Sequence, residues 1–156
     1  MARVQLALNV AGLDQAIAFY SKLFGTGPAK VRPGYANFAV ADPPLKLVLI
    51  ENAAKAPGSL NHLGVEVAST EEVMAAKQRL AAAGLPTTVE ESTTCCYAVQ
   101  DKVWAHGGPG DEPWEFYTVL ADAETAEGKP GVAEGTACCG AAPLPVAAST
   151  TAAPCC

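Results

Sequence analysis

The chain has no apolar run long enough to cross a membrane, no cluster of basic residues and no signal-peptide pattern at its start. A membrane span needs about 20 consecutive apolar residues, and nucleic-acid binding relies on clustered Lys and Arg that displace phosphate counterions. The formal net charge of −6 also disfavours a nucleic-acid partner. We therefore expect a cytoplasmic protein without membrane or nucleic-acid partners, in a compartment where thiols stay reduced.

The cysteines lack the spacing of a CxxC zinc site or of a secreted disulfide framework. All six occur as adjacent pairs: Cys95-Cys96, Cys138-Cys139 and Cys155-Cys156. Neighbouring Cα atoms lie about 3.8 Å apart, whereas a relaxed disulfide needs about 5.5–6 Å. A reduced, flexible pair is therefore better suited to a soft atom such as trivalent arsenic, Cd²⁺ or Hg²⁺. The alternative is two small buried residues that are neighbours by chance.

Apolar residues, in contrast, are plentiful: they make up half of the 156 positions, enough for one folded domain. The apolar residues follow strand-like alternation in some segments and helix-like spacing in others. The same order of segments occurs twice, which indicates an internal duplication. The first copy is expected to contain a strand at Val4–Val10, a helix at Leu13–Phe24, a weaker strand near Ala29–Arg32, and strands at Tyr35–Val40 and Lys46–Glu51.

The second copy follows a linker at Gly58–Asn61. It is expected to contain a strand at His62–Val67, a helix from a capping box at Ser69 to Ala83, and strands at Thr87–Glu90, Tyr97–Trp104 and Trp114–Leu120. The sequence thus predicts an α+β fold. Two tandem βαβββ modules, at about residues 1–57 and 58–121, form a curved mixed sheet around a metal-containing cavity, with the helices outside.

Residues 122–156 have a different composition, dominated by Ala, Pro, Thr, Gly and Ser. Such a segment lacks the large apolar side chains that would order it. We expect a disordered tail, which carries the pairs Cys138-Cys139 and Cys155-Cys156.

Three residues point away from the apolar faces of their predicted strands and towards the cavity: Gln5, His62 and Glu115. Oxygen and imidazole donors that leave coordination positions open suit Fe²⁺, Mn²⁺, Ni²⁺ or Zn²⁺. Taken singly, Gln5 is an ordinary outward polar residue and His62 an ordinary hydrogen-bonded histidine. Glu115 lies between aromatic residues, where a carboxylate needs a partner. His106, beside a glycine-rich turn, is a second-choice ligand.

Together, these features resemble the vicinal oxygen chelate superfamily, which includes glyoxalases, fosfomycin-resistance proteins and extradiol dioxygenases. The resemblance rests on the duplicated module, on Gln5 in the opening strand, on Asn61-His62-Leu63-Gly64-Val65 and on Pro109-Gly110-Asp111-Glu112-Pro113-Trp114-Glu115. Adding Thr94-Cys95-Cys96-Tyr97 and the opening Val4-Gln5-Leu6-Ala7-Leu8-Asn9-Val10, the chain closely resembles the organoarsenical carbon–arsenic lyases over about residues 1–120.

The resemblance implies an O₂-dependent enzyme in which Gln5, His62 and Glu115 bind Fe²⁺. Cys95 and Cys96 would then hold a trivalent organoarsenical, either methylarsonous acid or an aromatic arsenical, which is cleaved to arsenite.

Several further residues are accessory candidates. Tyr97 adjoins the cysteines, and Lys102 could lower the pKa of a thiol, although we expect a solvated surface lysine. The tail cysteines Cys138, Cys139, Cys155 and Cys156 could capture arsenicals and pass them inward.

Two other readings remain open: a glyoxalase-like metal enzyme, and a non-enzymatic protein that binds cadmium or arsenite. A sequestering protein needs only the cysteines and a glyoxalase only the metal ligands, whereas a lyase needs both.

Overall fold

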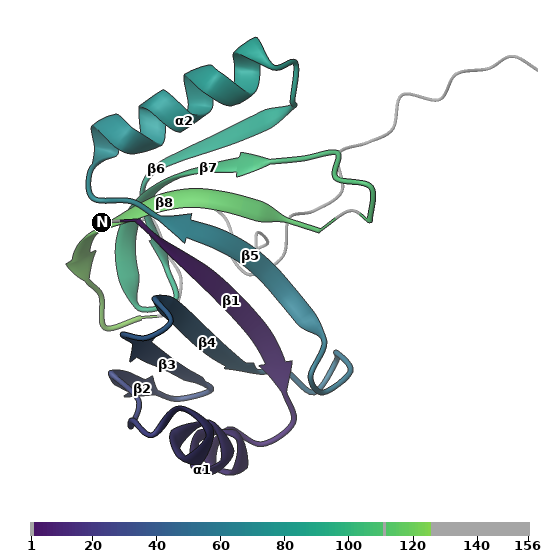
Figure 1. The fold of residues 1–156 in the computed structure, drawn as a ribbon, viewed down its shortest axis with the longest axis vertical. Helices are drawn as coiled ribbons and strands as arrows, with labels where there is room; N and C mark the ends of the chain where they lie inside the picture. Colours follow the sequence, from purple (N-terminus) through teal and green to yellow (C-terminus); the bar gives the residue numbers. More distant parts are fainter. Residues whose placement is uncertain (1, 111, 126–156) are drawn as a thin grey trace, which may run out of the picture.

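The computed structural model describes residues 2–110 and 112–125, which form one curved sheet with two helices (Figure 1). The strand order across this sheet is β2-β3-β4-β1-β5-β8-β7-β6. The elements are β1 (Arg3–Val10), α1 (Leu13–Phe24), β2 (Lys30–Arg32), β3 (Tyr35–Val40), β4 (Leu45–Glu51), β5 (Leu60–Glu66), α2 (Thr70–Ala82), β6 (Thr87–Cys95), β7 (Ala98–Ala105) and β8 (Trp114–Asp122).

The two halves of the sheet repeat one topology. In the first half, β1 runs parallel to β4, the last strand of its module, and in the second half β5 runs parallel to β8. The halves join through the antiparallel pair β1–β5 at the centre. The α+β fold of two tandem βαβββ modules is therefore confirmed, and the first strand of each module lies in the middle of the sheet.

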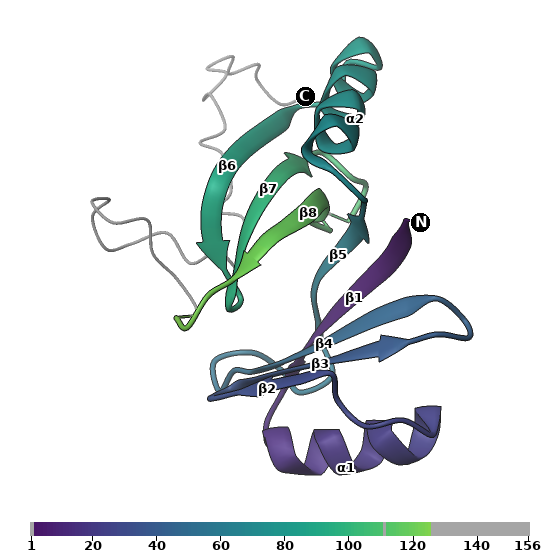
Figure 2. The same cartoon turned by 90° about the vertical axis from the view of Figure 1, so that its left-hand side faces the viewer.

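Each helix covers the outer face of its own half of the sheet (Figures 1 and 2). Helix α1 ends at Gly25, whose φ of 64° is the left-handed conformation that glycine adopts readily. Helix α2 begins at Ser69, whose side chain accepts a hydrogen bond from the Glu72 N–H, as the capping box predicts. Apolar side chains fill the outer layers: Phe38, Leu47 and Leu49 lie under α1, and Val73, Ala76 and Leu80 of α2 pack with Val103 of β7.

Strand β6 corrects one expectation. It was expected to end at Glu90 but continues to Cys95, because a bulge interrupts the alternation of side chains. The pairing with β7 shifts between Glu90 and Thr93, and the Ser92 N–H donates to Asp101 Oδ1 at 2.7 Å. The cysteine pair is therefore not in a long flexible loop: Cys95 closes β6, and only Cys96 and Tyr97 connect it to β7.

Strand β8 also runs further than the expected range, since it ends at Asp122. Its last residues pair with the first residues of β7, Asp122 with Ala98, next to the cysteine turn. The Ala123 N–H then donates to the Tyr97 carbonyl at 3.0 Å. A domain boundary at residue 121 would thus fall inside a strand.

The rest of the expected tail, with Cys138-Cys139 and Cys155-Cys156, lies outside the described residues. Neither helix within the described ranges is long and apolar enough to cross a membrane.

These contacts predict where the chain tolerates truncation. A chain ending after Thr125 should unfold in urea at the same midpoint as the full chain, because it keeps all of β8. A chain ending after Leu120 loses the pairing of Asp122 and the Ala123 hydrogen bond, and should lose at least about 1 kcal/mol of stability. Equal urea midpoints for the two truncated chains would show that the end of β8 is not needed.

Candidate metal centre and thiol pair

The three predicted metal ligands meet on the inner face of the sheet. Gln5 on β1 lies opposite Gly64 on β5, and Gly64 lies opposite Glu115 on β8. The Gln5 Nε2 atom is 2.9 Å from both His62 Nε2 and Glu115 Oε1, and His62 Nε2 is 3.3 Å from Glu115 Oε1. All three side chains are at most 4% exposed. We refer to the concave inner face of the sheet, on which they lie, as the hollow.

Gly64 makes this approach possible. A Cβ atom at this position would lie 3.1 Å from Glu115 Cγ and 3.4 Å from Gln5 Cβ. A side chain there would push apart the two residues that reach towards each other over β5. The glycine in the sequence motif following His62 is thus explained by the space it leaves.

A chain of amide groups sets the tautomer of His62. Asn9 Nδ2 donates to the Ser59 carbonyl, so Asn9 Oδ1 is the acceptor for Asn61 Nδ2 at 2.9 Å. Asn61 Oδ1 then faces His62 Nδ1 at 2.7 Å and must accept its proton. The Nε2 lone pair of His62 is left pointing into the hollow, as a metal-binding imidazole requires.

The side-chain nitrogen of Gln5 occupies a position that would also suit a metal cation, because two acceptor atoms face it. Its Nε2 group has two hydrogens, and they face His62 Nε2 and Glu115 Oε1. Within the described residues, the other Glu115 oxygen, Oε2, makes no hydrogen bond of acceptable geometry, although Lys102 Nζ lies 3.0 Å away. His62 Nε2 and Glu115 Oε1 thus both face the Gln5 nitrogen, and Glu115 Oε2 offers a further lone pair nearby. This donor set fits a divalent metal ion.

Tyr117 indicates how Gln5 would bind such an ion. The Tyr117 hydroxyl has one proton but faces two acceptors, Gln5 Oε1 at 2.6 Å and Glu66 Oε2 at 3.0 Å. If the Gln5 amide turned over, its nitrogen would donate to Tyr117, which would donate to Glu66. The proton donated to Tyr117 and the proton donated by Tyr117 would then each have one acceptor, and Gln5 Oε1 would face the metal position. Tyr117 lies two residues after Glu115 on the same strand face, the signal that could have identified it.

Lys102 is not the solvated surface lysine that we expected. It is 1% exposed, its ammonium lies 3.0 Å from Glu115 Oε2, and it is 5.3 Å from the centroid of the Trp104 ring. Burial alone would raise the pKa of Glu115, but the positive charge of Lys102 beside it holds that pKa at about 2. Burial would likewise lower the pKa of Lys102, but Glu115, followed by Cys95 and Cys96, raises it. At neutral pH the carboxylate is therefore ionised and ready to bind a cation.

The thiol pair lies at the β6–β7 turn. Cys96 and Tyr97 have φ angles of 54° and 62°, which match the positive φ values of a two-residue type I′ turn. The Cys95 and Cys96 sulfur atoms are 3.3 Å apart, well beyond the disulfide bond length of about 2.05 Å. Tyr97 anchors the turn, because its hydroxyl donates to the Pro33 carbonyl at 2.9 Å and its ring lies against Tyr35.

The thiols and the carboxylate share Lys102, whose pKa responds to Cys95 and Cys96 as well as to Glu115. The second-choice ligand His106 is placed elsewhere: its Nε2 atom contacts the Thr88 hydroxyl at 3.0 Å, an exposed contact. The structure thus brings together the predicted metal set and one predicted accessory lysine, and it leaves His106 out.

Comparison with known proteins places this site in context. Residues 3–117 match the model of the Glyoxalase/Bleomycin resistance protein/Dioxygenase superfamily. A trivalent organoarsenical cleaving enzyme from Thermomonospora curvata is 60% identical over 139 residues, 89% of each chain. The cadmium-induced protein CadI of Mycobacterium tuberculosis is 65% identical over 125 residues, 80% of this chain and 81% of that protein.

Among solved structures, an extradiol ring-cleaving dioxygenase from B. fuscum aligns with a TM-score of 0.55 and 19% identity. The alignment covers 78% of this chain and 34% of the dioxygenase. At this identity the likeness concerns the fold.

The buried ion pair predicts a large coupling. In metal-free protein, Lys102→Met leaves the Glu115 carboxylate buried without its counter-charge and should cost about 3–5 kcal/mol of unfolding free energy. The double variant Lys102→Met/Glu115→Gln should recover most of that loss, which a double-mutant cycle in urea measures. Additive losses in the cycle would rule out a direct pairing.

The hydrogen bonds of Tyr117 predict a role in metal affinity. Tyr117→Phe removes the partner that would hold the Gln5 amide with its oxygen towards the metal, and should weaken Fe²⁺ or Co²⁺ binding about tenfold, the factor given by about 1.4 kcal/mol. Anaerobic titration of the metal measures this directly. Tyr20→Phe, a change on α1, is the matched control and should leave the affinity unchanged. Equal affinities in all three proteins would contradict the assigned role of Tyr117.

Proposed function

Because the chain belongs to the Glyoxalase/Bleomycin resistance protein/Dioxygenase superfamily, we propose that it is an enzyme that cleaves the carbon–arsenic bond of trivalent organoarsenicals. The substrates would be methylarsonous acid or trivalent aromatic arsenicals, and the arsenic product arsenite. The reaction would use Fe²⁺ and O₂ and would serve organoarsenical detoxification in the cytoplasm. The name and identity of the T. curvata relative support this assignment.

The observation that carries the proposal is that two different sets of binding groups have Lys102 as a common neighbour. The Gln5, His62 and Glu115 side chains offer an oxygen and nitrogen donor set, and Cys95 and Cys96 offer two sulfurs 3.3 Å apart. Lys102 lies within electrostatic reach of both. A glyoxalase-like enzyme would use only the metal ligands and not the thiols.

The thiol pair would bind the substrate through its arsenic atom. Condensation of an arsonous acid with both thiols forms two As–S bonds and releases two water molecules, while the As–C bond stays intact. Trivalent arsenic is required, because its pentavalent form presents oxygens in place of a thiol-reactive centre.

The ligand set would hold the metal. Fe²⁺ bound by Gln5, His62 and Glu115 would supply the activation of O₂. One oxygen atom would replace carbon on arsenic, and the other would leave on the oxidised carbon fragment, an aldehyde when the fragment is methyl. The protein contributes the orientation of its ligands: the Asn61 side chain keeps the His62 Nε2 lone pair available, and Lys102 keeps Glu115 ionised.

A second candidate function follows from the other relative, whose name describes it as cadmium-induced. A thiol protein that binds cadmium or arsenite would need Cys95 and Cys96 but not the metal ligands on β1, β5 and β8. The two candidates therefore predict different consequences of the same substitutions.

Substitutions should separate arsenical binding from cleavage. Cys95→Ser/Cys96→Ser should lose organoarsenical binding and turnover but keep Fe²⁺ binding, because a hydroxyl is a poor partner for arsenic. His62→Ala should keep arsenical binding and lose both Fe²⁺ and turnover. Aerobic incubation with Fe²⁺ and methylarsonous acid, followed by arsenic speciation, reports turnover, and metal analysis reports Fe²⁺.

The tail cysteines must be excluded first, so both variants are made in the chain that ends after Thr125. Turnover at the wild-type rate by the double serine variant would refute the lyase proposal. A wild-type protein that binds Cd²⁺ or arsenite tightly but cleaves no organoarsenical would favour sequestration.

A further inference from the structure

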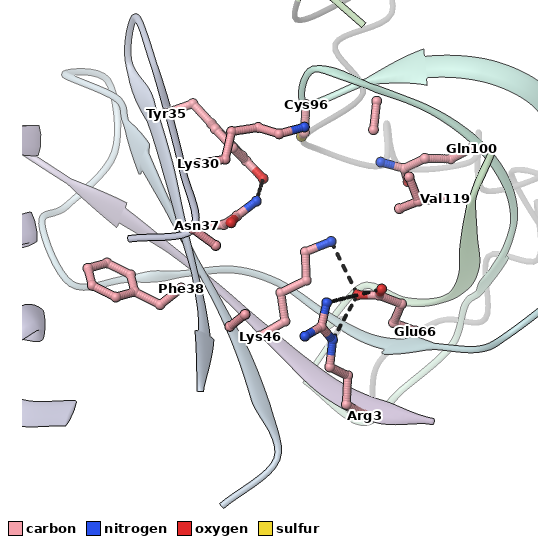
Figure 3. A pocket seen from close by; sticks show the side chains of 13 residues that line it. Arg3, Lys30, Tyr35, Asn37, Phe38, Lys46, Glu66, Cys96, Gln100 and Val119 are labelled. Carbon is pink, nitrogen blue, oxygen red and sulfur yellow. Dashed lines mark hydrogen bonds and ion pairs between the residues drawn. The ribbon is translucent and has the colours of Figure 1, made fainter. Parts of the chain in front are cut away.

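A pocket with an excess of cationic side chains adjoins Cys96. Its volume is about 200 Å³, and its wall includes Arg3, Lys30, Lys46 and Glu66 (Figure 3). Among the described residues of its lining, Glu66 is the one carboxylate beside three cations. This local surplus of positive charge occurs in a chain whose net charge is −6. The pocket therefore favours a negatively charged occupant.

Of the three cations in the pocket wall, Lys46 has its positive charge least balanced by a neighbouring carboxylate. It is 9% exposed, and its partner Glu66, at 3.3 Å, also accepts two hydrogen bonds from the Arg3 guanidinium. Burial lowers the pKa of Lys46 in spite of the Glu66 charge. Lys30, in contrast, forms an ion pair with Asp122 and donates to the Tyr97 carbonyl. A bound anion near Lys46 would balance its charge more fully than Glu66 does, because Glu66 is shared with Arg3.

One residue of the pocket wall, Lys46, is also the neighbour of a predicted metal ligand. Lys46 lies opposite Gln5 in the β1–β4 ladder, and its ammonium is 4.9 Å from the Tyr117 ring centroid. Tyr117 in turn donates to Gln5. A group attached to arsenic at Cys96 could thus extend into the pocket while its As–C bond stays near the metal ligands.

The size and lining of the pocket suit a substituted aromatic ring. A cavity of about 150 Å³ holds one benzene molecule, so about 200 Å³ accommodates a ring with a small substituent. Tyr35 and Val119, together with Ala39 and Ala98, provide apolar wall. Gln100 Oε1 is buried on this wall and finds no hydrogen-bond partner among the described residues, which adds a polar contact for water or a hydroxyl. A methyl group would leave most of this space unused.

We propose that this pocket binds the organic substituent of the arsenical and selects aromatic substituents that carry an acidic group, with Lys46 as the specificity-determining residue. The inference rests on the proposed function, because the thiols must hold the arsenic. It adds the substrate class: arylarsenicals with a carboxylate or a similarly acidic ring substituent.

The test compares two probes with the same arsenic chemistry, phenylarsonous acid and 4-carboxyphenylarsonous acid. Their dissociation constants are measured by equilibrium dialysis without iron or air, so binding is measured independently of cleavage. The wild-type protein should bind the carboxylated probe about tenfold more tightly, as expected for one added charge-assisted contact worth about 1.4 kcal/mol.

Variants assign the preference to Lys46. Lys46→Met should reduce the ratio of the two dissociation constants to about one while keeping the affinity for phenylarsonous acid, which shows that the variant is folded. Lys46→Arg should keep the preference, because it keeps the charge. Lys55→Met, an exposed lysine outside the pocket, is the matched control and should also keep it.

Two results would overturn the inference: equal affinities of the wild-type protein for both probes, or an unchanged preference in Lys46→Met. Either result leaves the proposed function standing, since both probes still bind the thiols. Failure of both probes to bind at all would overturn the proposed function together with the inference.

Discussion

The charge of the Glu115 carboxylate is the constraint on which the hollow depends. It is 2% exposed, and Lys102, His62 and Gln5 all face it. Burying two charges costs desolvation energy that their attraction does not reliably recover, and a pair of apolar residues at such positions is often as stable or more so. Stability alone therefore does not explain the pair, whereas the proposed binding of a cation by Glu115 would. The amide chain behind His62 and the hydroxyl of Tyr117 likewise orient polar groups towards one point.

Much of this arrangement could be predicted from the sequence, for identifiable reasons. Alternation of apolar residues assigned Gln5, His62 and Glu115 to inner faces. The structure agrees because the β1–β5 pairing stays in register from Gln5–Gly64 to Ala7–His62 and shifts only beyond that pair. Alternation alone says nothing about which strands are neighbours. The duplication supplied that information, because joining two equal modules through their first strands brings β1 and β5 together, and each then has the last strand of its module on its other side.

The errors arose where a pattern was broken or depended on strand register. The bulge at Ser92 hid the second half of β6, so the cysteines looked like part of a flexible loop. Lys102 was expected in solvent because an isolated lysine is rarely buried. Its partner lies on β8, and only the β7–β8 register brings the two together. The charge surplus around Lys46 could not be read from sequence either, since Arg3, Lys46 and Glu66 come from three strands.

The two-residue turn that carries Cys96 has a consequence for selectivity among thiol-binding species. Because the two sulfurs lie 3.3 Å apart in the ligand-free protein, the second As–S bond of the proposed complex would form within one molecule and at little entropic cost. The advantage is that of a bidentate chelator over separate monothiols, and it is available only to atoms that accept two sulfurs at a small angle. Species that bind a single thiol gain nothing from it, and an ion that prefers two opposed sulfurs would have to deform the hairpin. The geometry of one tight turn would thus select species that bind two sulfurs, before any step at the proposed metal site.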